Sequence, residues 1–220
     1  MNPLGENQRK RNAAAMTLVE LLVVVVIIVV LAGLLLPALS GGGPAKRVVC
    51  MSHLKQICLG FRMWADDNGG KFPTEISVTN HGTMEYLQSG IAYIHFLTIT
   101  NYMRNPKVFV CPCDTSRRPA TNSDEAFNNS NLSYFLNVNL GTNAAAVILS
   151  GDRNLTLDNV PLHRGSIQFT NGNALGWTTN IHRQNGGNVG FFDGHVQWMK
   201  NNSTNTLQAS GVETYHLLLP

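Results

Sequence analysis

The stretch Leu18–Leu39 limits what this chain can fold into more than any other feature. Glu20 is its only charged side chain, and residues 21–36 contain no polar side chain at all. Valine and isoleucine favour strands, but strands in globular proteins run to only about 3–10 residues. A helix of this length extends about 33 Å, and the hydrocarbon core of a membrane is about 30 Å thick. The length therefore predicts a membrane-spanning helix.

The positive charges around this stretch predict its orientation. Residues 9–11 read RKR, and no such cluster follows the stretch directly, although Lys46 and Arg47 come soon after. Lysine and arginine stay on the cytoplasmic side, so we expect the N-terminus there and the rest of the chain beyond the membrane. Two alternatives remain open: a plain anchor, or a secretory signal removed after Ser40. The apolar core of such a signal is usually only about 7–15 residues.

Composition gives little support to a nucleic-acid partner. The net charge is +3, and residues 9–11 alone account for it. Only 13% of the residues are charged, which is about half the usual share. Because nucleic-acid binding needs a basic face, we expect none.

Glu20 is a functional candidate because of where it lies. A carboxylate costs about 2.5–3.5 kcal/mol at the centre of a membrane helix and less near its end. It can extend to the membrane surface and carry no function. It can also pair with a cation of a neighbouring chain in a bundle of such helices.

The residues around Glu20 favour the second use. The sequence AAAMTLVELL resembles the cleavage and methylation motif of type IV prepilins. The resemblance implies that a prepilin peptidase removes residues 1–15 as a leader, cuts between Ala15 and Met16, and methylates the new amine. It makes Glu20 the assembly residue and Pro37 the helix-kinking proline. Ala15 departs from the family, which usually has glycine there. Methylation leaves the amine charged, so Glu20 of another subunit can pair with it.

A break and a second helix follow. Residues 40–44 read SGGGP, and glycine costs about 1 and proline about 3 kcal/mol inside a helix. We expect a break near residues 41–44, with Pro44 in the first turn of the next helix. Asn68 and the two glycines after it should end that helix. An apolar stripe at helical spacing should pack on a sheet, and comprises Cys50, Leu54, Ile57, Phe61 and Trp64.

The predicted fold class is α+β, with the long N-terminal helix over residues 16–68 packed on a small, mainly antiparallel sheet with long loops. Residues 69–220 suffice for one exported globular head. Residues 91–100 mix helix and strand signals, and residues 144–149 and 165–169 read as short strands. Residues 188–199 are the clearest element, because two extended runs flank an Asp-Gly pair. That pair predicts a hairpin whose two turn residues both have positive φ.

A second resemblance covers most of the chain. Short segments at Cys50, Phe72, Cys111 and Asp152, with the run from His182 to Gly194, are similar to prepilin-type proteins named for a histidine, nine residues and Asp-Gly. The resemblance makes His182, Asp193 and Gly194 the C-terminal motif. Ten residues, not nine, separate His182 from Asp193. Either the loop has one extra residue or His182 is not the equivalent histidine.

Catalysis is not expected from these residues. Histidine and aspartate suit a metal or a general base, but His182, Asp152, Asp193 and His195 form a site only if the fold brings them together. Aspartate is favoured in an Asp-Gly turn without any ligand, so Asp193 is expected to have a structural role. Neither a Gly-x-Ser-x-Gly motif nor a phosphate-binding glycine loop is present. No enzyme activity and no cofactor are expected.

Calcium is a weaker candidate ligand. Oxygen-bearing side chains alternate at Asp152, Asn154, Thr156 and Asp158, as they do in a calcium loop. The chain also resembles, at its N-terminus, the type II secretion pseudopilins, which carry calcium in the head. The glycine and the closing carboxylate of a calcium loop have no counterpart here.

The four cysteines fit an exported, oxidised domain. Cys50 and Cys58 would lie about 12 Å apart along a helix, beyond the roughly 7 Å limit for a disulfide. Each of them therefore needs Cys111 or Cys113, unless all four bind zinc. The second resemblance places Cys50 and Cys111 at family-like positions and implies that bridge.

The two resemblances imply a structural subunit that polymerises through its N-terminal helix into a type IV pilus or a type II secretion-like fibre. Its implied partners are copies of itself, other pilin-like subunits, the prepilin peptidase, inner-membrane assembly machinery and membrane lipid. The chain would cross the bacterial inner membrane once, with its head in the periplasm, before entering the fibre. The alternative is an exported ligand-binding or hydrolytic domain that uses the helix only as a tether.

Overall fold

The computed structural model describes residues 16–39, 42–103, 105–121, 127–139, 147–170, 172–183, 186–201 and 213–220. The predicted leader, with Ala15, lies outside the described residues, as does Ser40. The chain divides into two compact units, Met1–Gly42 and Gly43–Pro220. Apart from Gly42, the second helix lies in the second unit. The sequence-based boundary after residue 68 stays a prediction.

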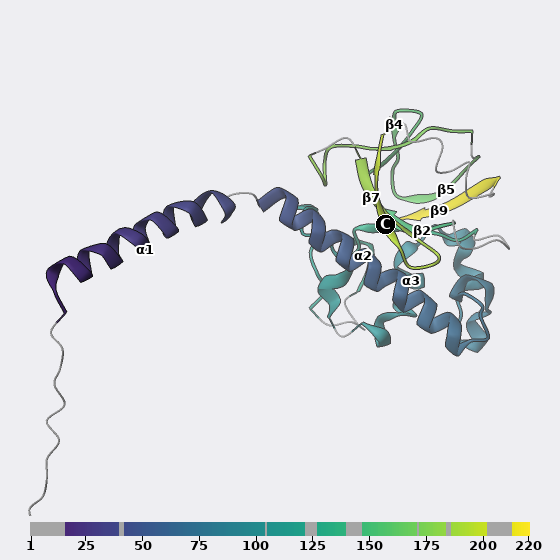
Figure 1. Cartoon of the computed structure of the whole chain (residues 1–220). Helices are drawn as coiled ribbons and strands as arrows, with labels where there is room; N and C mark the ends of the chain where they lie inside the picture. The colour runs from purple at the N-terminus through teal and green to yellow at the C-terminus, as the bar shows by residue number, and fades with distance from the viewer. Residues whose placement is uncertain are drawn as a thin grey trace, which may run out of the picture. The chain divides into compact units, whose positions relative to one another are not determined.

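The described residues of the first unit form helix α1, Leu18–Leu39 (Figure 1). It covers the predicted apolar stretch and includes Pro37 near its end. The side chains are described over residues 16–33, and all of them are exposed. Among the residues that the structure describes, no helix is both long and apolar enough to cross a membrane. The membrane span stays a prediction.

Helix α2, Gly42–Asp67, begins at the last residue of the first unit and continues in the second, so Pro44 does lie in its first turn. The predicted apolar stripe is buried along its whole length, from Cys50 at 0% exposed to Trp64 at 5%. The helix ends one residue before the predicted terminator, where the Asn68 side chain donates to Trp64 O at 2.7 Å. The stripe is confirmed as the face that α2 turns toward the core.

Within the described ranges, the main sheet has six strands, all antiparallel, in the order β5-β9-β1-β2-β7-β8. A smaller sheet has the order β4-β3-β6 and is also antiparallel. The α+β prediction is confirmed. The strands are β1 (Tyr134–Asn137), β2 (Ile148–Asp152), β3 (Leu155–Leu157), β4 (Val160–Pro161), β5 (Gly165–Thr170), β6 (Leu175–Trp177), β7 (Gly186–Phe191), β8 (Val196–Lys200) and β9 (Thr214–Leu219).

Strand β7 lies between two layers of the head. Glycines at positions 187 and 190 face opposite sides of the sheet, because side chains alternate along a strand. A Cβ at Gly190 would come within 2.4 Å of Cys58 Sγ on α2, and one at Gly187 within 2.2 Å of Trp177 Nε1 on β6. Helix α2 therefore covers one face of the main sheet at β7, and β6 of the smaller sheet covers the other.

Short helices complete the head. Residues 91–100, where the sequence signals were mixed, contain the helix α3, Ala92–Leu97, and Ala92, His95 and Phe96 are buried at helical spacing. Phe96 packs on Phe61 of α2 with ring centroids 5.5 Å apart, and both helices lie on one side of the sheet (Figure 1). The 3₁₀ helices are η1 (Pro73–Glu75), η2 (Val78–Asn80), η3 (Met84–Ser89), η4 (Thr100–Tyr102), η5 (Pro106–Phe109) and η6 (Asn129–Asn131).

The predicted β7–β8 hairpin is confirmed, but its turn type is wrong. Gly194 has φ +90°, whereas Asp193 is not among the residues with positive φ. Gly194 N donates to Phe191 O and Phe191 N donates to His195 O, both at 2.9 Å. These bonds close a three-residue loop with a glycine bulge instead of a two-residue turn. The extra loop residue lets Asp193 keep an ordinary backbone conformation.

Candidate functional site

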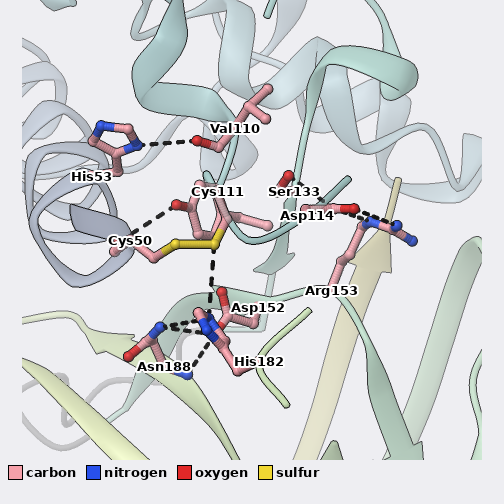
Figure 2. Close-up of a disulfide and its surroundings, with 11 residues drawn as sticks. Cys50, His53, Val110, Cys111, Asp114, Ser133, Asp152, Arg153, His182 and Asn188 are labelled. Atoms are coloured by element: carbon pink, nitrogen blue, oxygen red, sulfur yellow. Dashed lines mark hydrogen bonds and ion pairs between the residues drawn. A yellow bond between two sulfur atoms is a disulfide. The ribbon is translucent and has the colours of Figure 1, made fainter. Parts of the chain in front are cut away.

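A disulfide joins Cys50 of α2 to Cys111, which follows η5 (Figure 2). The two Cα atoms are 5.0 Å apart, and the two cysteines are 61 positions apart in the sequence. Beside the bridge, His53 Nδ1 donates to Val110 O at 3.1 Å. This is the pairing that the second resemblance implied. The disulfide joins α2 to the loop after η5.

A buried histidine lies directly against this disulfide. His182 Nε2 is 3.7 Å from Cys111 Sγ, 3.0 Å from Asp152 Oδ2 and 3.1 Å from Asn188 Nδ2 (Figure 2). Asp152 Oδ2 also accepts from Asn188 N at 2.6 Å. Adjacent strands supply Asp152 and Asn188, from β2 and β7, so the sheet itself fixes the cluster.

The other two cysteines have different surroundings. Cys113 is half-buried, and its sulfur lies within 4.8 Å of the sulfurs of Cys50 and Cys111. Burial, and then the nearby Asp152 carboxylate, raises the pKa of the Cys113 thiol. Cys58 lies apart, fully buried against β7. Burial raises the pKa of Cys58 to about 12, so that thiol stays protonated and unreactive.

The N-terminal candidate Glu20 makes contacts within its own chain. Thr17 N and Thr17 Oγ1 donate to Glu20 Oε2, at 2.8 and 2.9 Å, and Glu20 N donates back to Thr17 Oγ1 at 3.2 Å. This reciprocal arrangement is a capping box, which satisfies backbone N–H groups that a helix start leaves unpaired. It explains why α1 begins at Leu18. The signature Thr-x-x-Glu before an apolar run was readable in the sequence and was missed.

The capping box leaves the carboxylate accessible. The two donors of Thr17 reach the same oxygen, Oε2, and both Glu20 and Met16 are exposed. Glu20 can therefore cap its own helix and also face a cation from outside the chain.

Residues 10–36 match the family model described as the prokaryotic N-terminal methylation motif. The chain has a prepilin-like N-terminus. This match covers Met16, Glu20 and most of α1, and it is independent of the head. No curated protein and no solved structure matches the chain. The similarity of the head to the histidine-and-Asp-Gly proteins therefore remains a prediction.

In this prepilin-like chain the three residues of the predicted C-terminal motif lie in two places. His182 belongs to the disulfide cluster, whereas Asp193 and Gly194 form the β7–β8 loop. Asp193 Oδ1 accepts from His195 N at 2.9 Å, and Asp193 O accepts from Arg62 Nη1 at 2.6 Å. Among the described residues, His182 and Asp193 share no hydrogen bond or ion pair. Asp193 Oδ1 also lies 2.5 Å from His195 Nδ1, two residues along the same loop. All of these are contacts of a turn residue.

The calcium candidates also separate. Asp152 lies in the histidine cluster, and the Asn154 side chain donates to Thr178 O. Asp158 occupies a tight β3–β4 turn with φ +50°, where its carboxylate accepts from Asn173 Nδ2 and Ala174 N at 2.7 and 2.8 Å. The intervening residues form strand β3, and a strand sends alternate side chains to opposite faces. A calcium loop must instead curl around its ion.

One further pair has the residue types of a hydrolase. Ser166 Oγ on β5 lies 2.6 Å from His216 Nε2 on β9. Burial lowers the pKa of His216. Within the described residues, no carboxylate hydrogen-bonds this imidazole to orient it. The pair lacks the third member that serine nucleophiles commonly use.

Proposed function

We propose that this chain is a structural subunit of a type IV pilus or a type II secretion-like fibre. The methylation motif supports a prepilin-like substrate of prepilin peptidase. On this proposal the peptidase removes residues 1–15, cuts between Ala15 and Met16 and methylates the new amine. Helix α1 then carries the subunit into the fibre, with Pro37 as its kinking residue. The head would be carried by the fibre or exposed on its surface, and it would not act as a catalyst.

The observation that carries this proposal is the exposed Glu20 carboxylate at the start of an apolar helix inside the matched motif. A carboxylate in apolar surroundings gains most from an opposite charge at close range. The methylated Met16 amine of a neighbouring subunit is such a charge, since methylation preserves it. The partner of Glu20 in the fibre is therefore another copy of the chain or another pilin-like subunit.

The proposal also gives a location and partners. The chain would cross the bacterial inner membrane once through α1, with residues 9–11 on the cytoplasmic side and the head in the periplasm. The prepilin peptidase, the inner-membrane assembly machinery and lipid would contact α1. No nucleic acid is expected as a partner, because the net charge of +3 comes from residues 9–11.

Mass spectrometry of the chain from cells with and without the peptidase tests the proposal. We expect a mature chain that starts at N-methylated Met16 when the peptidase is present and an intact leader when it is absent. The variant Ala15→Gly restores the family's usual residue and should be processed at least as completely. A mature N-terminus at Gly41, or an uncut leader in cells with active peptidase, would contradict the proposal.

A tethered hydrolase is the second candidate, and the contact of Ser166 with His216 is the observation that favours it. A fluorophosphonate probe distinguishes the two functions, because it labels activated serines. The structural proposal predicts no labelling above that of the Ser166→Ala variant. Labelling of wild-type Ser166 that is lost in His216→Ala would favour the hydrolase.

A further inference from the structure

Three cysteines and one histidine converge at the disulfide. Cys50, Cys111, Cys113 and His182 each offer one ligand atom, and these atoms all lie within 4.8 Å of one another. Zinc with thiolate and imidazole ligands is tetrahedral, with bonds of about 2.3 Å to sulfur and about 2.0–2.1 Å to nitrogen. Ligand atoms in such a site are about 3.5–3.8 Å apart, so small side-chain rotations would suffice. Cys58 belongs to no such group among the described residues.

The cluster contains a second feature that favours a cation. Asp152 is fully buried, and its Oδ1 has no hydrogen-bond partner. Its Oδ2 lies 3.0 Å from His182 Nε2. In the oxidised form, a proton on this nitrogen would donate to the carboxylate as an ordinary hydrogen bond. A metal ion bound to this nitrogen would take the place of that proton.

We propose that Cys50, Cys111, Cys113 and His182 form a zinc site when the head is reduced, and that the disulfide is the oxidised form of the same site. The two forms exclude each other, because two sulfurs joined to each other cannot both bind one ion as thiolates. This inference goes beyond the proposed function, since it concerns only the head and holds whether or not the chain enters a fibre.

The exchange between the two forms balances with a phosphine as reductant. The phosphine and water become the phosphine oxide, and the Cys50–Cys111 bond becomes two thiols. Zinc then displaces the protons of three thiols, and His182 binds as the neutral imidazole. Cys113 is the residue that distinguishes a metal site from a simple disulfide, because the bridge does not need it.

The purified full-length chain in detergent, without an affinity tag, is the material for the test. After treatment with tris(2-carboxyethyl)phosphine and Zn²⁺, followed by removal of free metal, elemental analysis should find one zinc per chain. The untreated chain should retain none, and its peptide map should contain the Cys50–Cys111 bridge. Zinc should also protect Cys50, Cys111 and Cys113 from alkylation by iodoacetamide.

Two variants decide the result. Cys113→Ser leaves the disulfide intact and should lower zinc affinity at least about tenfold. Cys58→Ala is the matched control, because it removes a thiol outside the cluster and should bind zinc like the wild type. Circular dichroism of the oxidised variants checks their fold before reduction.

Three results would overturn the proposal. The reduced wild type could bind no stoichiometric zinc, Cys113→Ser could bind it normally, or both variants could lose it equally. The last result would show that unfolded thiols and not this site hold the metal.

Discussion

Asp114 fastens the segment that carries Cys111 and Cys113 to the end of β2. Its carboxylate accepts from Arg153 Nε at 2.8 Å and from Ser116 Oγ and Ser133 Oγ at 2.7 and 2.9 Å. Burial raises the pKa of Asp114, but the hydrogen bonds and the charge of Arg153 outweigh it, so the pKa lies below its usual value. The ionised carboxylate is thus the form that the fold prefers.

This preference makes stability depend on pH. Because the folded pKa of Asp114 is lowered, its contribution is complete above its ordinary pKa of 3.8 and is lost as the pH falls through the folded value. We expect Asp114→Asn to lower the free energy of unfolding by about 1–3 kcal/mol at pH 7. The difference from the wild type should shrink below pH ~3.8. Urea unfolding at several pH values measures it.

Asp66→Asn is the control for this experiment. Asp66 is an exposed carboxylate on α2. Its replacement should change the unfolding free energy by less than about 0.5 kcal/mol. A cost for Asp114→Asn that is the same at pH 3 and pH 7 would contradict the role of the charge.

Single residues also mark the limit of what the sequence predicts. Asp193 was expected in a turn and is in one, because turn preferences act over a few neighbours. His182 and Asp152 were considered together, but the contact of His182 with Cys111 was not predicted, since the two are 71 positions apart and only the fold brings them together. Calcium was considered at Asp152 because oxygen-bearing side chains alternate from Asp152 to Asp158. The alternation of side chains was visible, but their directions depend on strand β3.

At the scale of elements, the packing of α2 on β7 depends on the absence of a side chain at Gly190. A Cβ there would come within 2.4 Å of Cys58 Sγ and 3.2 Å of Leu54 Cγ, and both belong to the buried face of α2. The backbone of β7 and helix α2 are therefore closer than any residue larger than glycine at position 190 would allow. The helix cannot yield without moving the rest of its stripe.

We expect Gly190→Ala to lower the free energy of unfolding by about 1–3 kcal/mol, because it overfills a packed contact. Adding Cys58→Ala should recover part of that loss, since it removes the sulfur that the new methyl meets. Gly172→Ala is the control, because its nearest neighbour is 3.8 Å away. Denaturant unfolding of the single and double variants measures the coupling. If Gly190→Ala and Gly172→Ala lower the free energy of unfolding equally, α2 is not closely packed on β7 at position 190.

Elements were predictable where their pattern is local. The stripe of α2, strand β5 and the β7–β8 hairpin follow from spacing or turn residues within one short segment. Strands β1 and β9 were missed. Every residue of β1 is buried, so it shows no polar alternation. The smaller sheet was missed because β3, β4 and β6 have only two or three residues each.

At the scale of the whole molecule, the chain is a prepilin-like N-terminal unit joined to a separate, disulfide-bonded head. The head has its own core, which includes the buried face of α2. The apolar helix α1 has no described side chain that is buried. Changes in α1 should therefore affect assembly while leaving the head folded.

Glu20 and Thr17 allow the two roles of the carboxylate to be separated. Glu20→Gln removes the charge but keeps a side chain that can complete the capping box. Thr17→Ala removes the box but keeps the charge, at a cost of about 1 kcal/mol to the helix start. If assembly depends on the charge, only the first substitution should abolish it. If Glu20 acts only as a cap, the second should have the larger effect.

The most direct measurement is the fraction of each variant that enters fibres, with the wild-type chain absent and the membrane-bound pool quantified in parallel. We expect Glu20→Gln to reach the membrane normally but to enter fibres at least about tenfold less, since a lost ion pair of about 1.4 kcal/mol suffices for that. Thr17→Ala should enter at close to the wild-type level. Normal incorporation of Glu20→Gln would contradict the assembly role and favour a helix that only tethers the head.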